Sequence, residues 1–81
     1  MKGPHFDKEG NLTLHGAYDV YQKITGANES AAYEYLEKQS IRYTVGVLAA
    51  MLFMKRDWQS TEAQIISRAC RFYYPQCYKK D

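Results

Sequence analysis

Histidine and cysteine are the side chains that could do nucleophilic, acid–base or metal chemistry near neutral pH. This 81-residue sequence has two of each, His5, His15, Cys70 and Cys77. Zinc sites are usually built from ligand pairs about two to four residues apart, whereas these pairs are ten and seven positions apart. No serine stands in a Gly-x-Ser-x-Gly nucleophile elbow. We therefore expect no zinc site and no catalytic residue, and we do not predict an enzyme.

Two further kinds of ligand site are also unexpected. The acidic turn beginning at Asp7 places glycine fourth, where a calcium loop needs it sixth, and no glycine-rich phosphate loop occurs. No cofactor is therefore predicted. Cys70 and Cys77 flank Pro75, so the chain could fold back and bring them within disulfide reach. The alternative is a pair of reduced, partly buried thiols, which the absence of a secretory signal favours.

The most informative segment is the apolar run from Tyr43 to Met54. Its last six residues, beginning at Ala49, contain no polar side chain. Twelve residues are too few to span a bilayer, which takes about 20, so no membrane segment is predicted. A helix that is apolar all round must be covered all round, and two other short helices in a chain of this length leave part of it uncovered. We therefore predict a protein interface here, formed by Tyr43, Val47, Met51, Phe53, Met54 and Trp58; the alternative is a central helix fully wrapped by its own chain.

The charge distribution suggests a different class of partner. Residues 1–54 hold five Lys and Arg against six Asp and Glu, whereas residues 55–81 hold six against three. The basic C-terminal third interleaves cations with aromatic rings, which could stack on bases. A nucleic-acid surface is therefore the alternative prediction, using Lys55, Arg56, Arg68, Arg71, Tyr74, Lys79 and Lys80.

Apolar spacing and capping residues predict helices over most of the chain. A first helix is expected from about Thr13 to Thr25, closed by Gly26, and a second begins after the N-cap Asn28. The second helix either continues into the apolar run or gives way to a separate helix capped by Ser40. Leu36, Tyr43 and Val47 share one helical stripe, which favours continuity.

The C-terminal and N-terminal parts complete the expected fold. Thr61 to Gln64 matches a capping box, and we predict a last helix that starts near Ser60 or Thr61 and runs to about Tyr74, where Pro75 stops it. At the N-terminus, the turn from Asp7 to Asn11 could join the strands of a short β-hairpin. The predicted fold is a small all-α bundle of three to four helices, with residues 1–12 as an irregular or hairpin lead-in and residues 13–81 as a single domain.

These expectations converge on a binding protein. We predict a cytoplasmic, non-enzymatic protein that acts as an inhibitor, adaptor or regulator by binding another protein, and that self-associates as a homodimer. Eight tyrosines agree with this, because tyrosine is enriched at protein interfaces.

Overall fold

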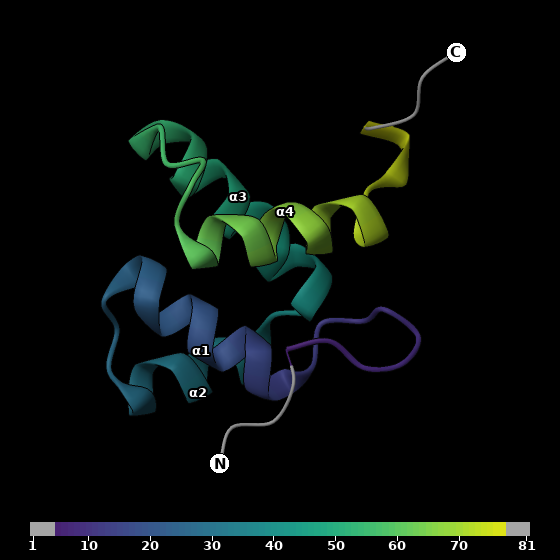
Figure 1. Ribbon diagram of the computed structural model, residues 1–81. Helices are drawn as coiled ribbons and strands as arrows, with labels where there is room; N and C mark the ends of the chain where they lie inside the picture. Colours follow the sequence, from purple (N-terminus) through teal and green to yellow (C-terminus); the bar gives the residue numbers. More distant parts are fainter. Residues whose placement is uncertain (1–4, 78–81) are drawn as a thin grey trace.

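The computed structural model of the protein describes residues 5–77, which form four α-helices and one 3₁₀ turn (Figure 1). The elements are α1 (Leu14–Thr25), α2 (Glu29–Lys38), α3 (Ile41–Lys55), α4 (Thr61–Tyr73) and η1 (Pro75–Cys77). The predicted small helical bundle is confirmed. No helix within residues 5–77 has both the length and the apolar character that crossing a membrane requires.

Capping side chains set where each helix begins. The side-chain oxygens of Thr13, Asn28, Ser40 and Ser60 each accept a hydrogen bond from a backbone N–H in the first turn that follows. Gly26 ends α1 in the left-handed conformation, with φ of 77°. The predicted roles of Gly26 and Asn28 are therefore confirmed.

Of the two alternatives for the residues after α2, a continuous helix through Gln39 and Ser40 does not form, and a separate helix capped by Ser40 does. Gln39 is extended, with φ of −114° and ψ of 145°, and the Ser40 hydroxyl accepts from the N–H of Tyr43 at 3.0 Å. Leu36 and Tyr43 are seven residues apart, a spacing that a straight helix would keep on one stripe. The local N-cap outweighs that pattern, and α3 begins as a separate helix.

The predicted start of the last helix near Ser60 or Thr61 is confirmed, but the capping box at Thr61 does not form, because the N-cap is Ser60. A capping box works when a side chain three residues into the helix satisfies the N–H of the N-cap residue. Here the carboxylate of Asp57 already accepts that N–H, at 3.1 Å. The amide of Gln64 donates instead to the carbonyl of Gln59 at 3.3 Å.

The predicted N-terminal hairpin does not form strands among the described residues. Phe6 and Leu12 make one isolated antiparallel bridge. Between them the N–H of Asp7 donates to the carbonyl of Asn11, and the carboxylate of Asp7 accepts the N–H groups of Glu9 and Asn11. Backbone and side-chain bonds together therefore close this loop around a single bridge.

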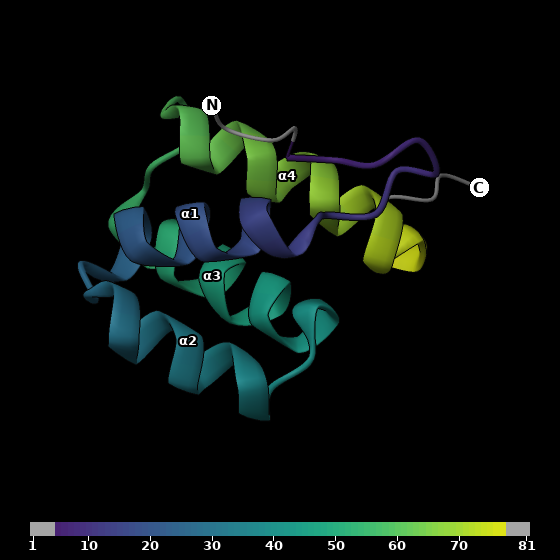
Figure 2. The ribbon, with the colours of Figure 1, turned by 90° about the horizontal axis from the view of Figure 1, so that it is seen from below.

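Helices α1 and α3 form the centre of the bundle. Figure 2 shows α2 and α4 on opposite sides of the molecule, with α1 and α3 between them. Helix α3 packs against α1 and α4, whereas α2 packs mainly against α1. The largest fully buried side chains are Leu48, Ile66, Val20, Val45 and Thr44.

Two pairs of aromatic rings join α2 to α1. Tyr18 meets Tyr33 edge to face with 4.4 Å between ring centroids, and Tyr21 stacks on Tyr35 at 4.7 Å. Such pairs stabilise a contact by about 1 kcal/mol beyond the area they bury. Four of the eight tyrosines therefore stabilise the contact between α1 and α2.

The N-terminal segment lies directly on α1. The side chain of His5 bonds the carboxylate of Asp19 at 3.0 Å, and the carbonyl of His5 accepts the N–H of Thr13 at 2.8 Å. Gly16 allows this approach, because a Cβ there would stand 2.8 Å from that same carbonyl oxygen.

We expect Gly16→Ala to lower the free energy of unfolding by about 1–3 kcal/mol, because the new methyl group must displace backbone. Urea denaturation measures this, with Ser30→Ala in the exposed first turn of α2 as the control for helix propensity. A stabilisation of about 0.5–1 kcal/mol, the ordinary effect of Gly→Ala inside a helix, would contradict the packing of residue 5 on α1.

Candidate protein-binding surface

Helix α3 has two apolar faces, of which its own chain covers one. The covered face carries Val45, Leu48 and Leu52, each at most 5% exposed. The other face follows the spacing of residues 43, 47, 50 and 54 and has no helix over it in residues 5–77. The sequence thus fills both sides of α3 with apolar groups, and the fold buries one.

Most of the predicted interface residues lie on the uncovered side. Tyr43 is 55% exposed, Phe53 68%, Met54 81% and Trp58 60%, and Val47 between them is half-buried. We call this set the α3 surface: Tyr43, Val47, Phe53, Met54 and Trp58. The sixth predicted residue, Met51, is half-buried and packs against the core.

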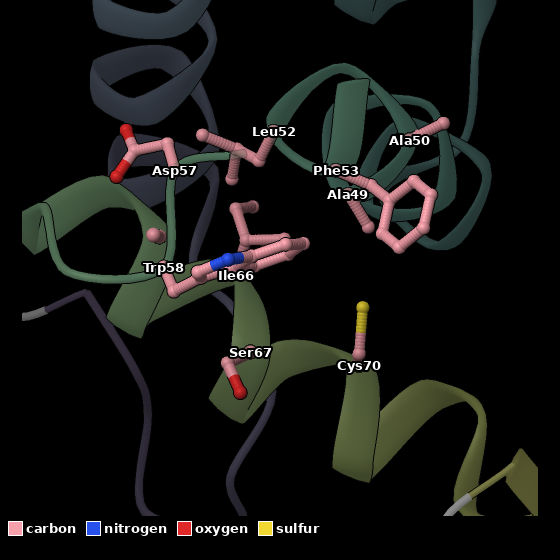
Figure 3. A pocket seen from close by; sticks show the side chains of 10 residues that line it. Ala49, Ala50, Leu52, Phe53, Asp57, Trp58, Ile66, Ser67 and Cys70 are labelled. Atoms are coloured by element: carbon pink, nitrogen blue, oxygen red, sulfur yellow. The ribbon is translucent and has the colours of Figure 1, made fainter. Parts of the chain in front are cut away.

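A groove of about 470 Å³ continues the α3 surface onto α4 (Figure 3). Its lining comes from the last turns of α3, the loop after them and one face of α4, and we call it the α3–α4 groove. The lining residues are Ala49, Ala50, Leu52, Phe53, Asp57, Trp58, Ala63, Ile66, Ser67 and Cys70.

Aromatic rings form one wall of the groove and small side chains leave it open. Phe53 and Trp58 meet edge to face with 5.5 Å between ring centroids. In Figure 3, the Trp58 indole lies across Ile66, and Cys70 extends its sulfur from α4 toward α3. A groove of this volume lies within the usual range for ligand pockets, about 300–1,000 Å³.

The contacts of Tyr74 mark the limit of the α3 surface near the start of α3. Its hydroxyl donates to the carbonyl of Arg42 at 2.7 Å, and the Arg42 guanidinium lies 4.4 Å from the centroid of its ring. A Cβ on Gly46 would stand 3.0 Å from that hydroxyl oxygen. Tyr74 therefore packs against α3 where the helix has no side chain.

Arg56 ends α3 in a conformation that disfavours most residues. Its φ is 56°, in the left-handed region. Its N–H bonds the carbonyl of Phe53 at 3.1 Å, and the N–H of Asp57 bonds that of Leu52 at 3.0 Å. This pair of bonds is the Schellman motif, in which the left-handed residue is usually glycine. Arg56 directly precedes two residues that line the groove.

The carboxylate of Asp57 fixes the loop between α3 and α4. It bonds the hydroxyl and the backbone N–H of Ser60 and the N–H of Gln59. These bonds hold the pKa of Asp57 below its ordinary value, with the Ser60 hydroxyl contributing most. The Asp57 carboxylate therefore makes its hydrogen bonds within the loop, although the residue also lines the groove.

The residues of the predicted nucleic-acid surface make contacts with separate parts of the fold. The Lys55 ammonium donates to the carbonyl of Ile24 at 3.1 Å, at the end of α1. The Arg68 guanidinium lies 4.4 Å from the centroid of the Phe6 ring. The ring of Tyr74 contacts the Arg42 guanidinium, as described above. Arg56 and Arg71 are exposed, and Lys79 and Lys80 lie outside the described residues, as does the side chain of Cys77.

The histidines and cysteines bring no ligand cluster together in the described part of the chain. No three His, Cys, Asp or Glu side chains in residues 5–77 are placed to hold a metal ion. His15 is exposed, and Cys70 is buried as part of the core.

Sequence reasoning missed the α4 side of the groove, namely Ala63, Ile66, Ser67 and Cys70. A chain of 81 residues has little material for both a core and a sizeable pocket, and the apolar spacing of α4 is that of an ordinary core-facing helix. The available signal was the pair of small residues Ala49 and Ala50, both of which line the groove.

Comparison of the chain with protein-family models, with curated proteins and with solved structures finds no match. The surface is therefore interpreted from its own chemistry.

We expect Arg56→Gly to raise the free energy of unfolding by about 0.5–1 kcal/mol, because glycine has no Cβ to strain in the left-handed region. The matched control is Arg56→Ala, which removes the same charge and keeps the strain. Urea denaturation of the three proteins should place the alanine variant with the wild type; equal gains for both variants would assign the effect to charge.

We expect Asp57→Asn to flatten the loss of stability in acid. The folded-state pKa is lowered, so the carboxylate stabilises the protein above its unfolded pKa of about 3.9, and that contribution is lost as pH falls through the folded pKa. Thermal melts between pH 2 and 7, about the range of this titration, should show a smaller drop for the Asn variant. Asp57→Ala, which keeps no acceptor, should melt lower at every pH; parallel curves for wild type and Asn would refute the assignment.

Proposed function

We propose that the protein is a non-enzymatic binding protein that uses the α3 surface and the adjoining groove to hold another protein. An inhibitor, an adaptor and a regulator all work in this way. A cytoplasmic location stays a prediction from the sequence.

The observation that carries the proposal is the exposure of Phe53 and Trp58, whose rings meet edge to face at the rim of the groove, together with the exposed side chain of Met54 next in the chain. Isolated exposed apolar side chains are common, but contiguous ones at the rim of a groove mark interaction sites. Aromatic and methionine side chains are also those enriched at protein interfaces.

The surface is held in place by its supporting contacts. Lys55 ties the end of α3 to α1, and Tyr74 ties its start to the end of α4. A site held on rigid elements loses less conformational entropy on binding.

A second copy of the chain is the alternative occupant. The exposed stripe runs along one helix, so α3 of two copies could pack around a twofold axis with the same residues on both sides. This would be the homodimer expected from the sequence.

Replacing Phe53 and Met54 together by Asp should abolish partner binding, because two carboxylates would be buried in an apolar contact. Tagged wild-type protein and variant are used for affinity capture from the native host, with quantitative mass spectrometry. We expect the partner to be depleted at least about tenfold in the variant, a loss of about 1.4 kcal/mol.

The control is Leu14→Asp, since Leu14 is 50% exposed at the start of α1 and away from the groove. Circular dichroism confirms folding of each variant, and light scattering shows whether wild type is a dimer that the double variant breaks. Identical sets of captured proteins and an unchanged molar mass for all three proteins would refute the proposal.

A further inference from the structure

A second hollow lies between α1 and α2, where it shares no lining residue with the α3–α4 groove. Helix α2 lies on the side of the molecule opposite α4 (Figure 2). The hollow measures about 170 Å³, less than the roughly 300–1,000 Å³ of pockets for drug-sized ligands, so it has room for a small group. We call it the α1–α2 pocket; its lining residues are His15, Tyr18, Asp19, Gln22, Glu29, Ala32 and Tyr33.

Two tyrosine rings contribute to the lining at an angle to each other. The planes of Tyr18 and Tyr33 are inclined at 68°, with 4.4 Å between ring centroids. The rings of Tyr21 and Tyr35 are inclined at only 18° and stack flat on each other, whereas steeply inclined rings stand like two sides of a box. Ala32 adds a small, buried apolar side chain to the same lining.

The carboxylates at this end of the molecule give the pocket a negative charge. Glu29 lines the pocket, and neither Glu29 nor Glu37 forms an ion pair with a lysine or arginine within residues 5–77. Burial raises the pKa of the Tyr18 hydroxyl, and Tyr33 and the charge of Glu37 raise it further. The Glu37 carboxylate is therefore close enough to act on a residue of the pocket.

The cations near the pocket do not reverse this sign. The His5 ring and the Lys23 ammonium approach the Asp19 carboxylate at 3.0 and 3.6 Å, and Lys23 also lies 3.9 Å from Glu62. These four groups are neutral together if His5 is protonated and negative if it is not. His15 adds at most one positive charge, which leaves the two carboxylates of Glu29 and Glu37 in excess.

Rings and carboxylates together suit a cation, because the face of an aromatic ring carries negative electrostatic potential. A bare ammonium group is strongly hydrated, and it would lose water against rings and an alanine that replace few of its hydrogen bonds. Methyl groups on the nitrogen reduce this cost, because they donate no strong hydrogen bond and pack against apolar surface. The ligand that this lining favours is therefore a methylated ammonium group.

We propose that the α1–α2 pocket binds a methylated ammonium group, with Tyr18 and Tyr33 against its methyl groups and Glu29 attracting its charge. Two sources have this chemistry: a free quaternary amine such as choline, and the side chain of a trimethylated lysine on another protein. The site is separate from the α3 surface, so it does not depend on the function proposed above.

The test is a titration of isotope-labelled wild-type protein with choline chloride, followed by the backbone amide signals in NMR spectra. The matched ligand is the uncharged isostere of choline, in which a carbon atom replaces the nitrogen. We expect saturable shifts at His15, Tyr18, Ala32 and Tyr33, and binding of the isostere about fivefold weaker or more, because it has the shape of choline without the charge.

Variants on α2 separate the ring from the charge. Tyr33→Leu should weaken choline binding about fivefold or more, whereas Tyr33→Phe, which keeps the ring, should bind like the wild type. Glu29→Gln should weaken binding about two- to fivefold, with a difference that shrinks as salt screens the charge. Glu34→Gln is the control, because Glu34 is exposed on the same helix and pairs with Lys38; its affinity should equal that of the wild type. Circular dichroism confirms that each variant is folded.

A short glycine peptide carrying one trimethyllysine, compared with its unmodified lysine counterpart, distinguishes the two sources. Tighter binding of the trimethylated peptide than of choline assigns the ligand to a protein, and the reverse order assigns it to a free amine. Equal binding of choline and its carbon isostere, or of the two peptides, would refute a site for a methylated cation. The proposal also fails if Tyr33→Leu binds like the wild type, or if neither choline nor the trimethylated peptide causes saturable shifts at the lining residues.

Discussion

The structure depends on how a chain of this size covers one apolar helix. Of the fifteen residues of α3, those from Val45 to Met54 are all apolar or glycine, so water is unfavourable on every side of it. Helices α1 and α4 cover the side with Leu48 and Leu52. Helix α2 is held to α1 by tyrosine pairs, and the segment before α1 lies on α1 and α4. Each described helix thus already packs against another part of the chain, and no described helix covers the side of α3 that carries Phe53 and Met54.

The long-range polar contacts reinforce this arrangement at the two ends of α3. At its end, the ammonium of Lys55 meets the carbonyl of Ile24 at the C-terminus of α1, where the helix dipole favours a cation. At its start, Tyr74 reaches from beyond α4 to the carbonyl of Arg42. Both bonds restrain α3 without contributing to the covering of its outer face. The exposed residues of α3 are therefore carried by a helix that is restrained at both ends. The loop from Arg56 to Ser60 positions Trp58 against Phe53.

Much of the fold could be predicted from sequence because its signals are local. Gly26 and Asn28 act through their own backbone and the next turn, and the apolar stripe of α4 is a property of one helix. The sequence was undecided or wrong where two local signals competed. At Ser40 a capping hydroxyl opposed a continuous stripe, and at the start of α4 the neighbouring residues Ser60 and Thr61 both offered a capping hydroxyl, of which Ser60 serves as the N-cap. Neither result follows from residue types without knowing the loop geometry.

The candidate surface was predictable in part for the same reason. The excess of apolar residues in α3 is visible in the sequence, so Phe53, Met54 and Trp58 could be named, whereas Met51 could not be assigned to the core without the positions of its neighbours. In the basic and aromatic C-terminal segment, the sequence does not show which groups the cations and rings contact. Arg68 and Tyr74 are near each other in sequence, but each contacts a different part of the fold. The cation of Arg68 lies over the ring of Phe6, and the ring of Tyr74 contacts the cation of Arg42. Such pairings depend on tertiary contacts that no spacing encodes.

Arg56 links the stability of the fold to its surface. A left-handed residue at the end of a helix is normally glycine, because any Cβ there is strained by about 1–2 kcal/mol. The Schellman bonds to Phe53 and Leu52 would form equally well with glycine, so the fold itself gives no reason for arginine. What arginine adds is an exposed, positively charged side chain on the residue directly before Asp57 and Trp58, which line the groove. Such strain, which the fold itself does not require, is located beside an exposed apolar surface, and this is consistent with the binding function proposed for that surface.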